Sequence, residues 1–128
     1  MRKAVNAAII NENREILIVL KNETWILPGG KPNESESDED CLRREINEEL
    51  SGTKLVGRLT FYGEFSGITP HKRDELTALV YFAGVSKVNN SSGEIRSAEW
   101  ISYKQRDNYR LSDITSRILY SLHEDNYI

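Results

Sequence analysis

The chain has 128 residues, 38% of them hydrophobic and 29% charged, and 17 Lys and Arg against 20 Asp and Glu give a net charge of -3. These values are ordinary for a globular protein and exclude a disordered chain. Because the net charge is negative, no extended nucleic-acid surface is expected, and local groups or metals must bind any phosphate. Cys41 is the only cysteine, which excludes an internal disulfide and fits a reducing compartment.

No membrane association is expected from the sequence. The N-terminal apolar run ends at Asn11 without a small-residue cleavage site, and no later run approaches the length of about 20 apolar residues that spans a bilayer. No segment of the sequence has the composition of a linker between domains. We therefore expect a single domain over residues 1–128 and a cytoplasmic location.

The first half of the chain predicts strands followed by a helix. Two β-rich runs, 4–10 and 15–20, are separated by a polar turn of hairpin length and are expected to pair. A short apolar piece at 25–27 should end at Pro28-Gly29-Gly30, where a loop begins. Ser35 and Ser37 are candidate helix caps, and the helix should run to about Leu50. Gly52 is expected to end it.

The second half predicts strands followed by another helix. Strands are expected at 55–65, 76–85 and 98–103, and the run LTALVYFAGV at 76–85 is apolar on both faces, as a covered central strand would be. Residues 112–124 repeat apolar side chains at the helical period. The order indicates an α/β fold in which a mixed β-sheet lies between helices.

Three glutamates of the first predicted helix share one face. Glu45, Glu48 and Glu49 are spaced i, i+3 and i+4, which places them within an arc of about 100°. The apolar stripe formed by Leu42 and Ile46 adjoins that arc. A solvated acidic face is one interpretation, since like-charge helix pairs cost only about 0.2 to 0.5 kcal/mol. The other is a metal site, where a divalent cation relieves the repulsion between partly covered acids.

The residues around the acids favour a hard metal and a phosphate. No cysteine or histidine lies near the glutamates, so the ligands are oxygens, which suit Mg²⁺ or Mn²⁺. Gly29 and Gly30 precede the helix and allow backbone atoms to approach a metal or phosphate closely. The spacing is not that of a P-loop. Alone, a Pro-Gly-Gly sequence is more often only a turn.

The whole stretch, about residues 30–52, resembles the Nudix box of the Nudix hydrolase superfamily. The pattern is glycine, five residues, glutamate, seven residues, then Arg-Glu-aliphatic-x-Glu-Glu, and it is matched in register by Gly30, Glu36, Arg44, Glu45, Ile46, Glu48 and Glu49. The closing glycine, Gly52, comes one residue later than in the family pattern. Outside the box the resemblance is looser, and it implies the family's α/β/α sandwich.

The resemblance implies a role for each matching residue. Glu45, Glu48 and Glu49 would bind Mg²⁺ or Mn²⁺, with a carbonyl of Gly29 or Gly30 as a further ligand. Arg44 would hold the glutamates in place and take part in catalysis with Glu48 and Glu49. Glu36 would support the loop and the helix electrostatically.

Residues outside the box supply candidates for the rest of the chemistry. Glu94 is the predicted general base, with Glu64 and Glu75 as weaker candidates. The basic cluster His71, Lys72 and Arg73 is a candidate substrate-binding site for a terminal phosphate. The aromatic residues of one strand could stack on a nucleobase or simply fill the core; they are Phe61, Tyr62 and Phe65.

The resemblance also implies the reaction. Nudix enzymes hydrolyse a diphosphate bond in a nucleoside diphosphate linked to another moiety, and the small size favours a MutT-like enzyme acting on nucleoside triphosphates. The alternatives are a nucleotide-sugar (ADP-ribose-type) or dinucleoside polyphosphate hydrolase, and a Nudix module that binds a nucleotide without cleaving it. Homodimers are common in the family, and the sequence leaves monomer and homodimer open.

Overall fold

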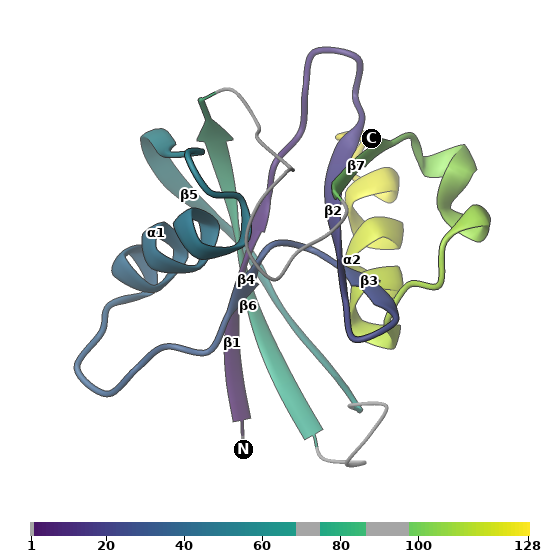
Figure 1. The fold of residues 1–128 in the computed structure, drawn as a ribbon. Coiled ribbons are helices and arrows are strands. Elements are labelled where there is room, and N and C mark those ends of the chain that lie inside the picture. Colours follow the sequence, from purple (N-terminus) through teal and green to yellow (C-terminus); the bar gives the residue numbers. More distant parts are fainter. Residues whose placement is uncertain (1, 69–74, 87–97) are drawn as a thin grey trace.

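The computed structural model describes residues 2–68, 75–86 and 98–128. The helices and strands are, in chain order, β1 (Arg2–Ala8), β2 (Ile16–Lys21), β3 (Thr24–Ile26), β4 (Gly29–Gly30), α1 (Asp38–Glu49), β5 (Leu55–Ile68), β6 (Glu75–Val85), β7 (Ala98–Ile101), the 3₁₀ helix η1 (Tyr103–Asn108) and α2 (Asp113–Glu124). Figure 1 shows the strands in the middle, with α1 on one side and α2 on the other. The predicted α/β fold, with β-structure between helices, is confirmed.

The strands divide into two sheets, where a single one was expected. The four-stranded sheet has the order β4-β1-β6-β5, and the three-stranded sheet has the order β3-β2-β7. Strand β1 runs parallel to β6 and antiparallel to β4, so the larger sheet is mixed. The smaller sheet is antiparallel throughout. Strand β6 is central in the larger sheet, as its apolar sequence predicts.

The predicted pairing of the runs 4–10 and 15–20 holds only where the two runs approach the turn. Strand β1 pairs with β4 and β6, whereas β2 pairs with β3 and β7. Beyond the end of β1, the two runs meet through a bridge between Ile10 and Ile16 and a hydrogen bond from Leu17 N to Ile9 O at 3.0 Å. Both long edges of β1 are already occupied by other strands, so the polar turn joins two sheets and does not close a regular hairpin.

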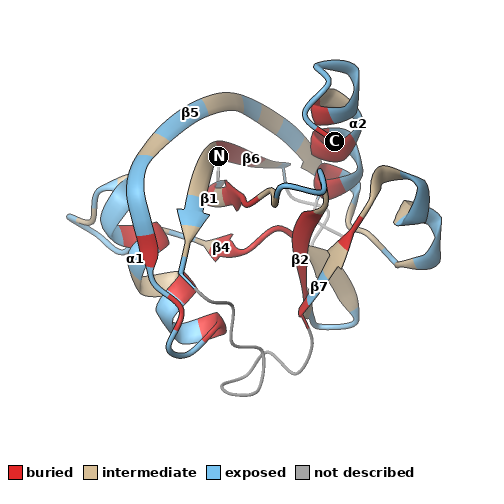
Figure 2. Ribbon diagram, turned by 90° about the horizontal axis from the view of Figure 1, so that it is seen from above, coloured by how far each residue is buried: buried red, intermediate tan, exposed pale blue. Residues whose placement is uncertain are grey.

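The core lies on both sides of the strands because alternate residues of a strand point in opposite directions. On β1, Val5 and Ala7 belong to the cluster that contains the buried face of α1. Ala8 belongs to the cluster that contains the buried face of α2. Figure 2 shows the buried segments along the strands and on the inner sides of both helices. Each helix is therefore held by its own apolar cluster.

Several boundaries differ from the prediction. Gly29 and Gly30 form a short strand, where a loop was expected, because Gly29 at φ +144° lies so close to β1 that any Cβ would meet Val5 O at 2.1 Å. Strand β5 continues to Ile68. Strand β7 ends at Ile101, since Ser102 and Gln105 form a capping box that begins η1.

The two helix predictions agree closely with the structure. Ser37 caps α1 by accepting a hydrogen bond from Asp40 N. After α1 ends at Glu49, Gly52 adopts φ +86° in the following turn. The glycine that comes one residue late in the box therefore has the left-handed conformation that this turn requires. Ser112 caps α2 in the same way. Among residues 2–68, 75–86 and 98–128, no helix combines the length and apolar character that a bilayer crossing requires.

Candidate active site

Helix α1 carries most of the candidate site, and its local sequence fixes where it begins. The Ser37 side chain satisfies a free amide of the first turn. Asp38, Glu39 and Asp40 place negative charge at the positive end of the helix dipole. Leu42 and Ile46 are fully buried and set the rotation of the helix about its axis. The residues beside this stripe are therefore turned toward β1 and β4.

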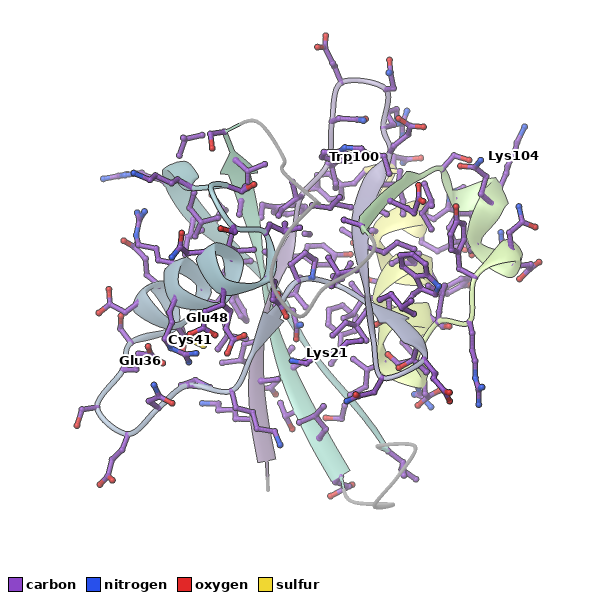
Figure 3. All side chains as sticks on the ribbon, viewed as in Figure 1. Lys21, Glu36, Cys41, Glu48, Trp100 and Lys104 are labelled. Carbon is purple, nitrogen blue, oxygen red and sulfur yellow. The ribbon has the colours of Figure 1, made fainter. Side chains whose placement is uncertain are left out.

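Arg44 is the centre of an ion-pair network. Its guanidinium contacts Glu36 at two points, Nε to Oε2 at 2.8 Å and Nη2 to Oε1 at 2.9 Å. It also donates to Glu45 Oε1 at 2.8 Å and lies 3.5 Å from Glu48 Oε2. Figure 3 shows Glu36 and Glu48 on the α1 side of the molecule. One arginine thus ties the loop before the helix to two of the three helical glutamates.

Glu36 is held ionised by this network. The Arg44 hydrogen bonds, with help from the Asn33 amide, lower the pKa of Glu36 to about 2. In return Glu36, with Glu45, raises the pKa of Arg44 above its usual value. The two-point contact between guanidinium and carboxylate is stronger and more directional than a single hydrogen bond. The loop from Lys31 to Ser37 is therefore fixed at a defined distance from α1.

Glu49 has a different environment from the other two glutamates. Its side chain is 6% exposed, whereas that of Glu48 is 58% exposed. The Gly29 amide donates to Glu49 Oε1 at 3.0 Å. Its other oxygen, Oε2, is buried and accepts no hydrogen bond from the described residues, and Lys21 Nζ lies 3.8 Å from it. Burial raises the pKa of Glu49 to about 7, although the Gly29 amide and Lys21 oppose the rise.

Gly30 brings the backbone of β4 against the helix. A Cβ at this position would lie 2.5 Å from the carboxyl carbon of Glu45. A larger residue here would displace the flexible end of the Glu45 side chain. The Gly30 carbonyl accepts a hydrogen bond from the Cys41 thiol at 3.7 Å. The glycines and the helical acids thus meet, as the sequence spacing requires.

The site fits a divalent cation by its donor chemistry. The side-chain donors are carboxylate oxygens, which Mg²⁺ and Mn²⁺ prefer, and a buried oxygen such as Glu49 Oε2 needs a partner. Within the described residues, no three His, Cys, Asp or Glu side chains are already grouped as ligands of one ion. Glu45 and Glu48 are directed to Arg44, and Glu49 to Gly29 and Lys21. Side-chain rotation would have to bring them together.

A cavity of about 420 Å³ adjoins these residues. Gly29, Gly30, Arg44 and Glu45 line one end. The remainder is lined by apolar side chains of β3, β6 and α2 and by the polar side chains of Asn6, Lys21 and Thr24, among others. This volume lies in the range of small-molecule sites.

Several predicted site residues lie elsewhere. Glu94 and the cluster His71, Lys72 and Arg73 fall outside the described residues. The two weaker candidates for the general base, Glu64 and Glu75, are exposed and are not among the described residues that line the cavity.

The aromatic residues of β5 are divided between the surface and the core: Phe61 is 53% exposed, whereas Tyr62 and Phe65 are partly buried against the cluster that contains α2. Phe61 packs edge-on against Tyr81. Tyr62 stacks on Phe65 and bonds to Ser121 of α2. None of the three aromatic residues proposed as base-stacking candidates lines the described cavity.

Lys21 and Asn6 are among the cavity residues that were not identified from the sequence. Lys21 is the last residue of β2, and its ammonium lies 3.8 Å from Glu49 Oε2. This contact depends on how the two sheets pack against each other, which the sequence does not reveal. Asn6, in contrast, could have been identified from the sequence. It is a polar residue between Ala4 and Ala8, at positions that face the same side of β1.

Comparison with known proteins identifies the family. The model of the NUDIX domain matches residues 1–120. The MutT NUDIX hydrolase of Burkholderia pseudomallei has a similar structure, with a TM-score of 0.74 and 27% identity, covering 93% of this chain and 95% of that one. The MutT protein of Methanosarcina mazei Go1 has the same fold at 24% identity, with a TM-score of 0.77 over 98% of this chain and 94% of that one.

A more distant similarity is to a much longer protein. The mRNA-decapping enzyme subunit 2 of Saccharomyces cerevisiae is 31% identical over 106 residues, which is 77% of this chain. The chain spans about a tenth of the length of the curated relatives that it matches. The chain belongs to the Nudix family, whose members act on diphosphate bonds in small nucleotide substrates and generally use a divalent metal.

Proposed function

We propose that the protein hydrolyses a diphosphate bond of a nucleoside triphosphate, as a MutT-like pyrophosphohydrolase that uses Mg²⁺ or Mn²⁺. The observation that carries this proposal is the position of Glu49. Its Oε2 is buried and without a hydrogen bond from the described residues, and it lies one residue along the helix from Glu48 and near Gly29 of the cavity wall. Lys21 Nζ, at 3.8 Å, is too far away to bond this oxygen closely, whereas a divalent cation would bind it directly, beside a cavity of nucleotide size.

In the proposed site, Glu45, Glu48 and Glu49 bind the metal, with a carbonyl of Gly29 or Gly30. When bound, a divalent cation lowers the pKa of a coordinated water and neutralises phosphate charge. Arg44 orients Glu45 and Glu48 through the contacts described above.

Residues around the metal ligands complete the proposed site. Glu36 fixes the Arg44 guanidinium by a two-point contact. Lys21 places positive charge at the edge of the cavity, where a phosphate would lie. Glu94 stays the predicted general base. His71, Lys72 and Arg73 stay the predicted contacts of a terminal phosphate.

Hydrolysis assays with a matched pair of variants test the proposal. The protein is incubated with Mg²⁺ and nucleoside triphosphates, ADP-ribose, dinucleoside polyphosphates and a capped dinucleotide, and the products are separated. Glu49→Gln should abolish cleavage. Glu39→Gln changes an exposed glutamate of the same helix that pairs only with Arg43 among the described residues, and it should leave the rate unchanged.

The products distinguish the candidate reactions. Release of pyrophosphate from a triphosphate supports the proposal. The similarity to a decapping enzyme favours a second candidate, hydrolysis of a capped RNA end, and exclusive cleavage of the capped dinucleotide would select it. Tight nucleotide binding without turnover of any compound would contradict both and indicate a binding module. A cytoplasmic location and a single domain over residues 1–128 remain predictions from the sequence, which leaves the oligomeric state open.

A further inference from the structure

We propose that Asn6 determines the base specificity of the cavity by accepting a hydrogen bond from the exocyclic amino group of an adenine or cytosine base. The inference rests on the proposed function, because it assumes that a nucleotide occupies the cavity with its phosphates at the box. It concerns the other part of the cavity, toward α2, and a residue outside the box.

On the face of the four-stranded sheet that is directed toward α2, small side chains line the cavity. Ala4 and Ala78 are Cα partners on β1 and β6, and both line the cavity. Two methyl groups side by side leave the space that larger strand residues would fill. On the opposite wall, α2 contributes Ile114 and Ile118. The result is an apolar slot between a sheet and a helix, suited to a flat ring.

Asn6 is a polar residue between two alanines, Ala4 and Ala8, on this face of β1. It lines the cavity, next in the face to Ala4 and opposite Val80 in the sheet. A polar residue between two alanines breaks the local apolar pattern, and such exceptions concentrate at functional sites. Its backbone neighbour across the strands is Gly29, so Asn6 lies between the apolar slot and the box.

The orientation of the Asn6 amide is fixed by its neighbours. Nδ2 donates to Leu27 O at 3.0 Å and reaches Pro28 O at 3.5 Å. Both neighbours are carbonyls, which only accept, so the nitrogen must face them. This leaves Oδ1 as the side chain's other polar atom, and none of the hydrogen bonds between described residues involves it. The cavity is therefore lined by a held acceptor to which no described residue donates a hydrogen bond.

A fixed acceptor selects a donor on the ligand. Adenine and cytosine carry an amino group where hypoxanthine and uracil carry an oxo group, so ATP with ITP and CTP with UTP form matched pairs. An oxo oxygen on the base would face Asn6 Oδ1, and because both atoms only accept hydrogen bonds, both would be left unpaired in a partly buried slot. Sites that bond a specific polar group discriminate strongly against analogues that lack it. We expect kcat/KM about tenfold higher for the amino member of each pair.

Steady-state kinetics with the four nucleotides test the inference. In the wild-type protein the preference should lie mainly in KM, because Asn6 contacts the base and not the reacting phosphate. Asn6→Ala should reduce the tenfold ratio to about one by removing the acceptor. Asn47→Ala is the matched control, since Asn47 is exposed on α1 and is not among the residues that line this cavity; it should keep the ratio.

The outcomes separate this inference from the proposed function. Equal cleavage of both members of each pair would leave the hydrolase function standing and overturn the role of Asn6, even if the Asn6→Ala protein does not fold. If no nucleotide is cleaved, calorimetric binding of the α,β-methylene analogues of ATP and ITP decides. Tighter binding of the ATP analogue, lost in Asn6→Ala, would support the inference. Equal binding, or none, would overturn it.

Discussion

Replacing Glu49 with glutamine should change how the stability of the metal-free protein depends on pH. Burial raises the pKa of Glu49 from its ordinary value of 4.5 to about 7. In the folded chain the carboxyl therefore keeps its proton over a pH range in which the unfolded chain has lost it. The free energy of unfolding must then fall as the pH rises through this range. Glutamine carries no titrating proton, so the variant lacks this contribution.

The magnitude follows from the pKa difference. At 1.36 kcal/mol per pH unit, a rise from 4.5 to about 7 corresponds to about 3 kcal/mol of unfolding free energy, present below pH 4.5 and lost above pH 7. Relative to the wild type, Glu49→Gln should therefore gain about 3 kcal/mol between pH 4 and pH 8. Comparing two pH values cancels any packing effect of the glutamine side chain, since that effect is the same at both.

Urea unfolding in the presence of EDTA, followed by circular dichroism at pH 4, 6 and 8, measures this difference. The Glu39→Gln variant is the control, because Glu39 is an exposed residue of the same helix. Its stability should remain parallel to that of the wild type. Parallel curves for the wild type and Glu49→Gln across the same range would refute the claim that Glu49 is buried at an energetic cost.

Three further substitutions have distinct expected outcomes. Gly30→Ala should keep the melting temperature within a few degrees of the wild type but lower kcat at least about tenfold, because the new Cβ would displace the flexible end of Glu45. Thermal unfolding measures the first effect and steady-state kinetics the second. Arg44→Lys should also lower kcat at least about tenfold, since a lysine cannot make the two-point contact with the loop; a wild-type rate would contradict the positioning role. Tyr81→Phe should cost about 1 kcal/mol in urea unfolding by removing the 2.5 Å hydrogen bond to Asp38, and an unchanged midpoint would argue against that bond.

The parts of the fold that could be predicted from the sequence are those that local patterns determine. Ser37, one of the two predicted caps, begins α1, and α2 lies where the apolar repeat over residues 112–124 predicts a helix. The pairing of strands is a different problem, because the partner of an apolar strand depends on residues far along the chain. The turn at 11–14 has hairpin length, yet β1 finds its partners at Gly29–Gly30 and in β6.

In the candidate site, too, the features that one helix determines could be predicted, and those that depend on tertiary packing could not. The spacing of Arg44 and the helical glutamates follows from one helix, so the sequence predicts that they lie together. The sequence did not predict that Arg44 would bind Glu36 at two points, or that Glu49 would be buried while Glu48 stays exposed. Those differences depend on the rotation of α1 against β4 and on Lys21, which comes from the second sheet.

The binding of Mn²⁺ by the wild type and by Glu49→Gln, followed by electron paramagnetic resonance, tests the central claim most directly. The claim is that the buried Glu49 carboxylate forms part of a metal site beside the cavity. The wild type should bind Mn²⁺ at the box, and Glu49→Gln should bind it at least about tenfold more weakly, while Glu39→Gln binds as the wild type does. Equal affinity in Glu49→Gln and the wild type would contradict the claim and leave Glu49 as a buried acid without a catalytic metal.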